Sequence, residues 1–161
     1  MKKIFAVITL GVLVSTPILA TATPLAPASA LDLSLMEAGV IGQDYKYKNP
    51  KVTAQVFSEL NKQLNANLPM MTAEGMQATS VSITPYKSTY VHSYTMDIAK
   101  DKASALKKEI GSPAVLSKLC SEVFLTERFL SANNHRMTFR YQLKNGKKLV
   151  DVKMNNATCT T

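Results

Sequence analysis

The sequence predicts an α+β fold: a two-layer sandwich in which about three helices cover one face of a sheet of about four antiparallel strands. Two observations support this prediction. A helical pattern of apolar residues over 50–66 precedes a stretch that alternates polar and apolar residues, and two further helical segments precede a second alternating stretch. Each alternating stretch folds back at a turn, so two hairpins supply the sheet.

The first helix and hairpin occupy residues 50–98. Asn49 is a good helix cap, and Pro50 suits a first helical turn, so the helix begins here. We expect it to end before Leu68-Pro69. The stretches 76–84 and 89–98 alternate polar and apolar residues on either side of a Pro-containing turn, which predicts an antiparallel hairpin.

The second half of the chain repeats this order. A short helix over 101–110 is closed by Gly111, and Ser112-Pro113 starts another helix by the same capping rule. Residues 137–143 then alternate as a strand. Asn145-Gly146 is the strongest short hairpin signal, and 149–154 is the returning strand.

Residues 1–22 have the pattern of a secretory signal peptide. Lys2 and Lys3 precede an apolar run over 4–14, and Ala20-Thr21-Ala22 is an A-x-A cleavage site. The run is too short to span a bilayer, and no second one follows, so we expect no transmembrane segment in the mature chain. Residues 23–48 are interpreted as an N-terminal arm or linker that offers a second cleavage site after Ala30, and 49–161 as the folded domain. The sequence therefore predicts a periplasmic or secreted protein.

The chain is basic, with a formal net charge of +8, of which Lys2 and Lys3 contribute two. This charge either serves solubility alone or favours weak contact with anionic surfaces of the envelope. The basic residues are scattered, except over 100–108 and 144–148, and no arginine-rich patch is interleaved with aromatic residues. Nucleic-acid binding is therefore not expected.

Cys120 and Cys159 are the only cysteines, and two cysteines in an exported chain predict one disulfide. The alternative is two free thiols or a redox pair, but redox pairs usually lie close together as C-x-x-C. Neither cysteine directly follows the predicted signal peptide, so attachment of lipid to an N-terminal cysteine is not expected.

No assembled catalytic or metal-binding motif is present, and we expect no catalytic residue, cofactor or metal. His92 and His135 are the candidate bases of a small hydrolase, but no nucleophile-elbow pattern accompanies them. Glu122 and Glu127 do not share a helix face, which argues against a glycosidase pair. Methionines at 70, 71, 76 and 96 suit either Cu(I) binding or, more simply, a methionine-filled core.

Aromatic residues share faces of two predicted strands. Tyr90 and Tyr94 lie on one strand and Tyr141 on another, with Arg140 near the edge of this face. Such a surface is either a partner-binding platform or part of the interface between sheet and helices. We therefore take Tyr90, Tyr94, Arg140 and Tyr141 as candidate partner-binding residues.

Several sparse positions resemble a known kind of protein. Their order is Leu68-Pro69, Tyr90 to Tyr94, Cys120, Phe139-x-Tyr141, Asn145-Gly146 and Cys159. This order resembles small, largely uncharacterised exported proteins of Gram-negative bacteria. The resemblance implies a periplasmic, disulfide-tied α+β domain and no catalytic residue. Envelope accessory proteins of secretion systems also look similar, but their usual lipid-attachment cysteine is missing here.

Three functions remain open from the sequence. The leading hypothesis is a non-enzymatic interaction protein that binds another envelope protein, as an accessory of secretion or surface assembly or as an inhibitor or immunity factor. The second is a small-ligand-binding protein with a pocket between sheet and helices. The third is a small hydrolase that uses His92 or His135.

Overall fold

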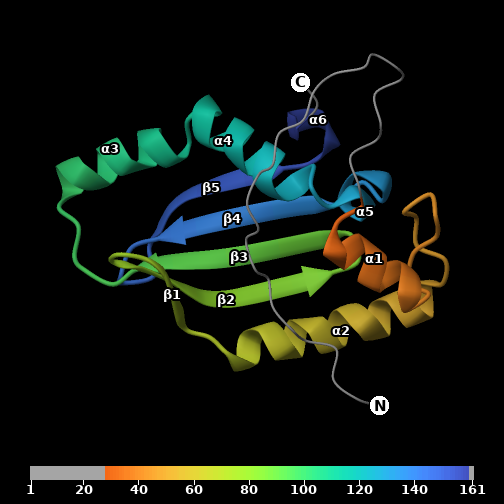
Figure 1. The fold of residues 1–161 in the computed structure, drawn as a ribbon. Coiled ribbons are helices and arrows are strands. Elements are labelled where there is room, and N and C mark those ends of the chain that lie inside the picture. Colours follow the sequence, from red (N-terminus) through yellow and green to blue (C-terminus); the bar gives the residue numbers. More distant parts are fainter. Residues whose placement is uncertain (1–27, 160–161) are drawn as a thin grey trace, which may run out of the picture.

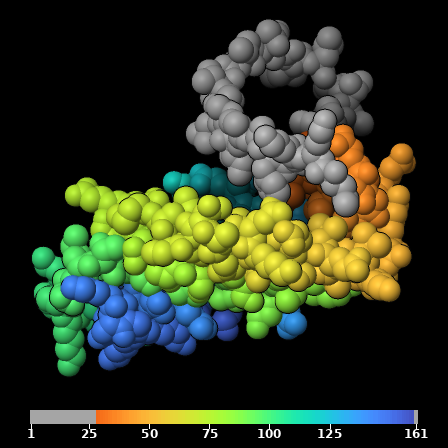
Figure 2. Space-filling model, turned by 90° about the horizontal axis from the view of Figure 1, so that it is seen from below, coloured from red at the N-terminus to blue at the C-terminus, as the bar shows by residue number. Residues whose placement is uncertain are grey.

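The computed structural model describes residues 28–159 (Figure 1). Within this range a mixed sheet of five strands carries helices on one face, and α1 and α4 lie on the same side of it in both views (Figures 1 and 2). The predicted α+β class is confirmed. The predicted signal peptide, residues 1–22, and its cleavage site after Ala22 lie outside the described residues.

The strands are arranged in the order in which they follow one another in the chain. The prediction of a four-stranded, wholly antiparallel sheet is wrong, because the described chain has a fifth strand at one edge and because β3 and β4 run parallel. The two hairpins predicted from the sequence are present as the antiparallel pairs β2–β3 and β4–β5. The strands are β1 (Met70–Ala73), β2 (Met76–Thr84), β3 (Lys87–Tyr94), β4 (Arg136–Gln142) and β5 (Lys148–Met154).

The parallel pairing follows from the long connection between the hairpins. A tight turn can only reverse a strand, whereas a long helical connection can return the chain to the end at which the previous strand began. Hairpin signals in a sequence predict how the two strands of one hairpin pair. They do not predict whether the neighbouring strands of two different hairpins run parallel or antiparallel. The connection contains α3 (Lys100–Ile110), α4 (Pro113–Leu119), a π-helical turn η1 (Cys120–Phe124) and α5 (Arg128–Ala132).

The helix α2 (Pro50–Ala66) has the predicted bounds, and the Asn49 side chain accepts hydrogen bonds from its first turn. It packs along β2, and Figure 1 shows α2 running beside this strand. β1 pairs with β2 only as far as Ala78. Beyond that point the side-chain Oδ1 atoms of Asn61 and Asn65 accept hydrogen bonds from the backbone N–H groups of Ile83 and Val81, at 2.8 and 3.1 Å. The helix therefore provides hydrogen-bond partners for backbone N–H groups at the edge of β2 that β1 does not cover.

The helices meet the sheet in one apolar core. Phe124 and Met154 are fully buried, and Phe57 and Phe129 meet edge to face with ring centroids 6.3 Å apart. Burial of aromatic rings contributes strongly to stability, so this end of the sheet is its most firmly held part. The buried apolar cluster contains Leu35, Val40, Ile41, Phe57, Cys120, Phe124, Phe129, Leu130, Met137, Met154 and Cys159.

The described part of the segment interpreted as an arm packs on this core. In the helix α1 (Ala30–Glu37), the buried Asp32 carboxylate accepts from the backbone N–H groups of Arg128 and Phe129 at 3.0 and 3.1 Å. Asp32, although distant in the sequence, therefore provides hydrogen-bond acceptors for the free backbone N–H groups of the first turn of α5. Val40 and Ile41 follow and are completely buried.

The predicted disulfide is present. Cys120 begins η1 and Cys159 ends α6 (Asn156–Cys159), and their Cα atoms are 5.3 Å apart. The bond joins the helical connection to the segment that follows β5. It therefore holds the described C-terminal end of the chain against the core.

Candidate partner-binding groove

Aromatic rings form a stack on the helix side of β3 and β4. The parallel register places Tyr90 beside Phe139 and His92 beside Tyr141. Ring centroids are 5.1 Å apart for Tyr90–Phe139, 5.6 Å for His92–Phe139 and 5.4 Å for His92–Tyr141. Because alternate residues of a strand share a face, Tyr94 continues this row toward the end of β3.

The row runs from the core to the surface. Tyr90 packs against the buried cluster, and burial raises the pKa of its hydroxyl. Burial also raises the pKa of Tyr141 and of Tyr94, which the nearby Glu109 carboxylate raises further. Glu109 belongs to α3, so the outer end of the ring row faces this helix.

A groove of about 540 Å³ lies between α3 and this end of the sheet. Its apolar lining comes from Tyr94, Met96 and Ile98 on the sheet side and from Ala105 and Leu106 on α3. Charged groups stand at its rim: Glu74, Asp97, Lys102 and Glu109.

The groove exists because α3 stands off from the sheet. Ala103, Leu106 and Ile110 share one side of the helix, yet no residue of α3 is buried within the described structure. At the C-terminal end Gly111 brings the chain close to β5, where an added Cβ would lie 3.5 Å from Val150. α3 is therefore attached at its C-terminal end and leaves its apolar side open toward the groove.

Three methionines near the groove are exposed. Met70 and Met71 of β1 are 53% and 58% accessible, and Met96 is 56% accessible. The expectation that these methionines fill the core is wrong for Met70 and Met71, which lie on an edge strand, and for Met96, which lies in the loop after β3. Met76 is half-buried. Gly75, with a φ of +70° in the β1–β2 turn, lies so close to Met96 that an added Cβ would be 3.0 Å from its Cε atom. Flexible thioether side chains at a surface suit binding of an apolar partner.

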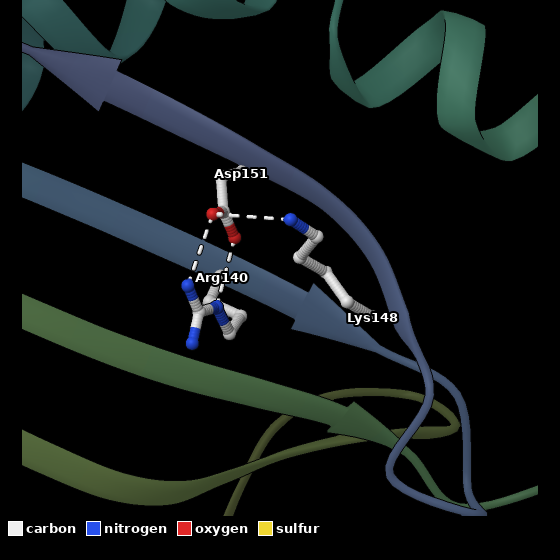
Figure 3. A network of polar contacts seen from close by, with 3 residues as sticks. All are labelled: Arg140, Lys148 and Asp151. Carbon is white, nitrogen blue, oxygen red and sulfur yellow. Dashed lines mark hydrogen bonds and ion pairs between the residues drawn. The ribbon is translucent and has the colours of Figure 1, made fainter.

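The candidate partner-binding residues separate onto two faces. Tyr90, Tyr94 and Tyr141 lie on the helix side, whereas Arg140 lies on the open side of the sheet. Arg140 donates from Nε and from a terminal guanidinium nitrogen to the Asp151 carboxylate at 2.9 and 3.0 Å, and Lys148 approaches it at 3.9 Å (Figure 3). The Arg140 hydrogen bonds lower the pKa of Asp151 and raise that of Arg140. Of the four residues, only Tyr94 lines the groove.

Both histidines make contacts that hold the fold together. His135 is buried; its Nδ1 is 3.0 Å from the Pro85 carbonyl, which can only accept, so Nε2 accepts from the Ser88 hydroxyl at 3.0 Å. His92 is stacked in the ring row, and its Nδ1 is 3.5 Å from the Thr72 hydroxyl. Burial lowers the pKa of both. Over residues 28–159 neither is hydrogen-bonded to a carboxylate, as a catalytic His–acid pair would be.

Two further observations concern the part of the chain that the structure describes, residues 28–159. No group of three or more His, Cys, Asp or Glu residues in this part of the chain is placed to hold a metal ion. None of its helices has the length and apolar character that crossing a bilayer requires.

Comparison with known proteins reveals fold similarity at low sequence identity. A crystal structure from Pseudomonas aeruginosa, of a protein provisionally described as secreted, has a TM-score of 0.51 at 12% identity, over 69% of this chain and 96% of that chain. The pilotin of the Vibrio vulnificus type 2 secretion system, EpsS, has a TM-score of 0.47 at 17% identity, over 70% and 96% of the two chains. No family model and no curated protein matches the sequence.

The Pseudomonas structure shows a shared fold and no more. This shared fold and the Cys120–Cys159 disulfide fit the disulfide-tied α+β domain that the sequence resemblance implies. The groove residues of α3 were not among the residues expected from the sequence. The sequence held one weak indication of this groove. The α3 segment contains four lysines and only a narrow stripe of apolar residues, which is too narrow for a helix that is packed on both sides.

Proposed function

We propose that this protein is a non-enzymatic interaction protein of the bacterial envelope, and that its groove binds an apolar segment of another envelope protein. The observation that supports this proposal is the unfilled apolar side of α3, which faces Tyr94 and Met96 across an open groove. Exposed apolar patches rimmed by polar residues are typical of protein interaction sites.

The groove also defines the chemistry of the partner segment. Its floor is apolar, and the exposed Met96 forms part of it. At the rim Glu74, Glu109 and Lys102 form no ion pair within residues 28–159. Asp97 contacts only Lys144 there, at 3.3 Å, so acidic groups outnumber basic ones at the rim. A segment with two or three large apolar side chains and adjacent basic residues complements this arrangement.

Comparative affinity capture from a periplasmic extract tests the proposal. Wild-type protein, Met96→Asp and Leu106→Asp are used as baits, with Ser117→Asp on the exposed side of α4 as the matched control. We expect wild type and control to retain one envelope protein in stoichiometric amount, and each groove variant to retain at least about tenfold less, because a buried carboxylate opposes apolar contact.

Equal capture by all four baits would contradict the groove as the binding site. Recovery of no stoichiometric protein, together with turnover of an envelope substrate, would contradict the non-enzymatic role. Met96 is exposed, so its substitution tests the groove even if Leu106→Asp fails to fold. Circular dichroism of each bait identifies such a failure.

A small-ligand-binding protein is the second candidate, supported by the size of the groove. Its volume of about 540 Å³ lies in the range of small-molecule sites. However, Tyr90 and Tyr141, which a pocket between sheet and helices would use, do not line it. Native mass spectrometry of protein purified from its host distinguishes the two functions, because a bound ligand adds mass that denaturation removes.

A further inference from the structure

The side of the sheet that faces away from the helices is basic and polar. Cross-strand register places Lys87 beside Arg136, and Thr89, Thr138 and Lys153 in one row. The adjacent row contains Arg140 and Asp151. We call this surface the basic sheet face; its charged residues are Lys87, Arg136, Arg140, Lys148, Asp151 and Lys153.

Most of this positive charge is uncompensated. Asp151 is the one carboxylate among these residues, and Arg140 and Lys148 already contact it. Lys87, Arg136 and Lys153 form no ion pair with any residue in the described range, and each is exposed. Together with Thr89 and Thr138 they line a hollow of about 300 Å³, whose lining also includes Met137, Arg140, Asp151, Met154 and Asn155.

The distribution of these groups favours an extended anionic surface over a single small anion. Neighbouring strands lie about 4.8 Å apart and alternate residues about 7 Å apart, so the backbone positions of these cations on three strands cover an area wider than a single small anion. The outward residues of β3 and β4 include Thr89, Val91, Thr138 and Gln142 but no aromatic residue or methionine. A protein interface usually has such anchors at its centre.

We propose that the basic sheet face docks on an anionic lipid surface. The ammonium and guanidinium groups of Lys87, Arg136 and Lys153 donate to headgroup phosphates, and the hydroxyls of Thr89 and Thr138 lie between them. The groove at α3 lies on the helix side of the sheet, so lipid contact leaves it accessible. This proposal is independent of the partner-binding function.

Vesicle co-sedimentation tests the docking. The exported protein, with the N-terminus that the cell produces, is mixed at about 0.1 M salt with vesicles of about 30% phosphatidylglycerol in phosphatidylcholine. Each basic residue near an anionic bilayer changes partitioning by about fivefold, so the triple variant K87Q/R136Q/K153Q should partition about 100-fold more weakly than wild type. Vesicles of phosphatidylcholine alone should bind neither protein.

The matched control is K51Q/K107Q/K108Q, which removes the same charge from exposed positions on α2 and α3. We expect it to lose less than about fivefold. Equal losses in both triple variants, absence of wild-type binding, or binding that persists at about 1 M salt would overturn the proposal. A soluble acidic peptide, polyglutamate, is tested in parallel. Wild-type protein could bind polyglutamate more tightly than vesicles, and the triple variant K87Q/R136Q/K153Q could lose this binding. That result would overturn the proposal of lipid docking in favour of an acidic protein partner.

Discussion

Along β4, Met137, Phe139 and Tyr141 face the helices, whereas Thr138, Arg140 and Gln142 face away from them. The helix side stacks rings and buries methionines against α1, η1 and α5. The open side carries hydroxyl and cationic side chains. The same strand therefore contributes to the core through one set of alternate residues and places the other, polar set on the open side, where Arg140 pairs with Asp151 and Gln142 donates to Ser93. Four predictions test this division, in order of decreasing effect.

The largest effect should come from the disulfide that closes the helix side. Replacing Cys120 and Cys159 with serine removes a cross-link across 39 residues, so the free energy of unfolding should fall by about 4 kcal/mol. Urea unfolding of both proteins measures the change. Reduction of wild type should give a similar loss, and a loss below about 1 kcal/mol would contradict a stabilising role.

Adjacent residues of β4 provide the second test. Phe139→Ala removes the ring that stacks on Tyr90 and His92 and should cost about 3 kcal/mol. Thr138→Ala, on the open side, should change stability by less than about 0.5 kcal/mol. Similar losses in the two variants would show that the open side also supports the fold.

The pH dependence of stability provides the third test. Burial lowers the pKa of His135 in the folded protein below the value of 6.5 expected for an exposed histidine. As pH falls through 6.5 the unfolded chain therefore binds more protons than the folded chain, and the free energy of unfolding should decrease. Chemical denaturation between about pH 7.5 and 5 measures this slope.

The variant His135→Gln should flatten this slope. His92→Gln should also flatten the slope, because burial lowers the pKa of His92 as well. A slope of opposite sign that His135→Gln removes would show that His135 is charged in the folded protein. A slope of opposite sign that the variant keeps would instead reflect Glu127, because burial raises the pKa of that carboxyl group.

The smallest effect should come from the ion pair on the open side. The Arg140 side chain is 43% accessible and that of Asp151 is 13% accessible, so solvent screens their attraction. Their coupling energy in a double-mutant cycle of Arg140→Gln and Asp151→Asn should be below about 1 kcal/mol. A value of several kcal/mol would make this pair a structural element, comparable with the ring stack.

Local structure could be predicted from the sequence because its signals are local. Asn49-Pro50 and Ser112-Pro113 begin helices as predicted, and Asn145-Gly146 lies between two strands. β1 was missed because its four residues are all exposed, so no alternation marks it. The parallel pairing of β3 with β4 was missed because it depends on the path of 41 intervening residues, numbered 95–135.

The candidate site was predictable in one part. Tyr90, Tyr94 and Tyr141 were correctly expected to lie on common strand faces. Arg140 is adjacent to Tyr141, so the two-residue period of a strand places its side chain on the opposite face. The groove could not be predicted, because it arises from the position of α3 relative to the sheet, which no residue pattern within α3 specifies.

The amides of Asn61 and Asn65 have a consequence for self-association. An open strand edge can template the addition of further chains and so begin a fibril. On β2 the backbone groups that would receive another strand already bond to these two amides. Growth of the sheet at this edge would first require α2 to detach. Along this stretch of β2, protection against strand addition therefore depends on two uncharged side chains of one helix.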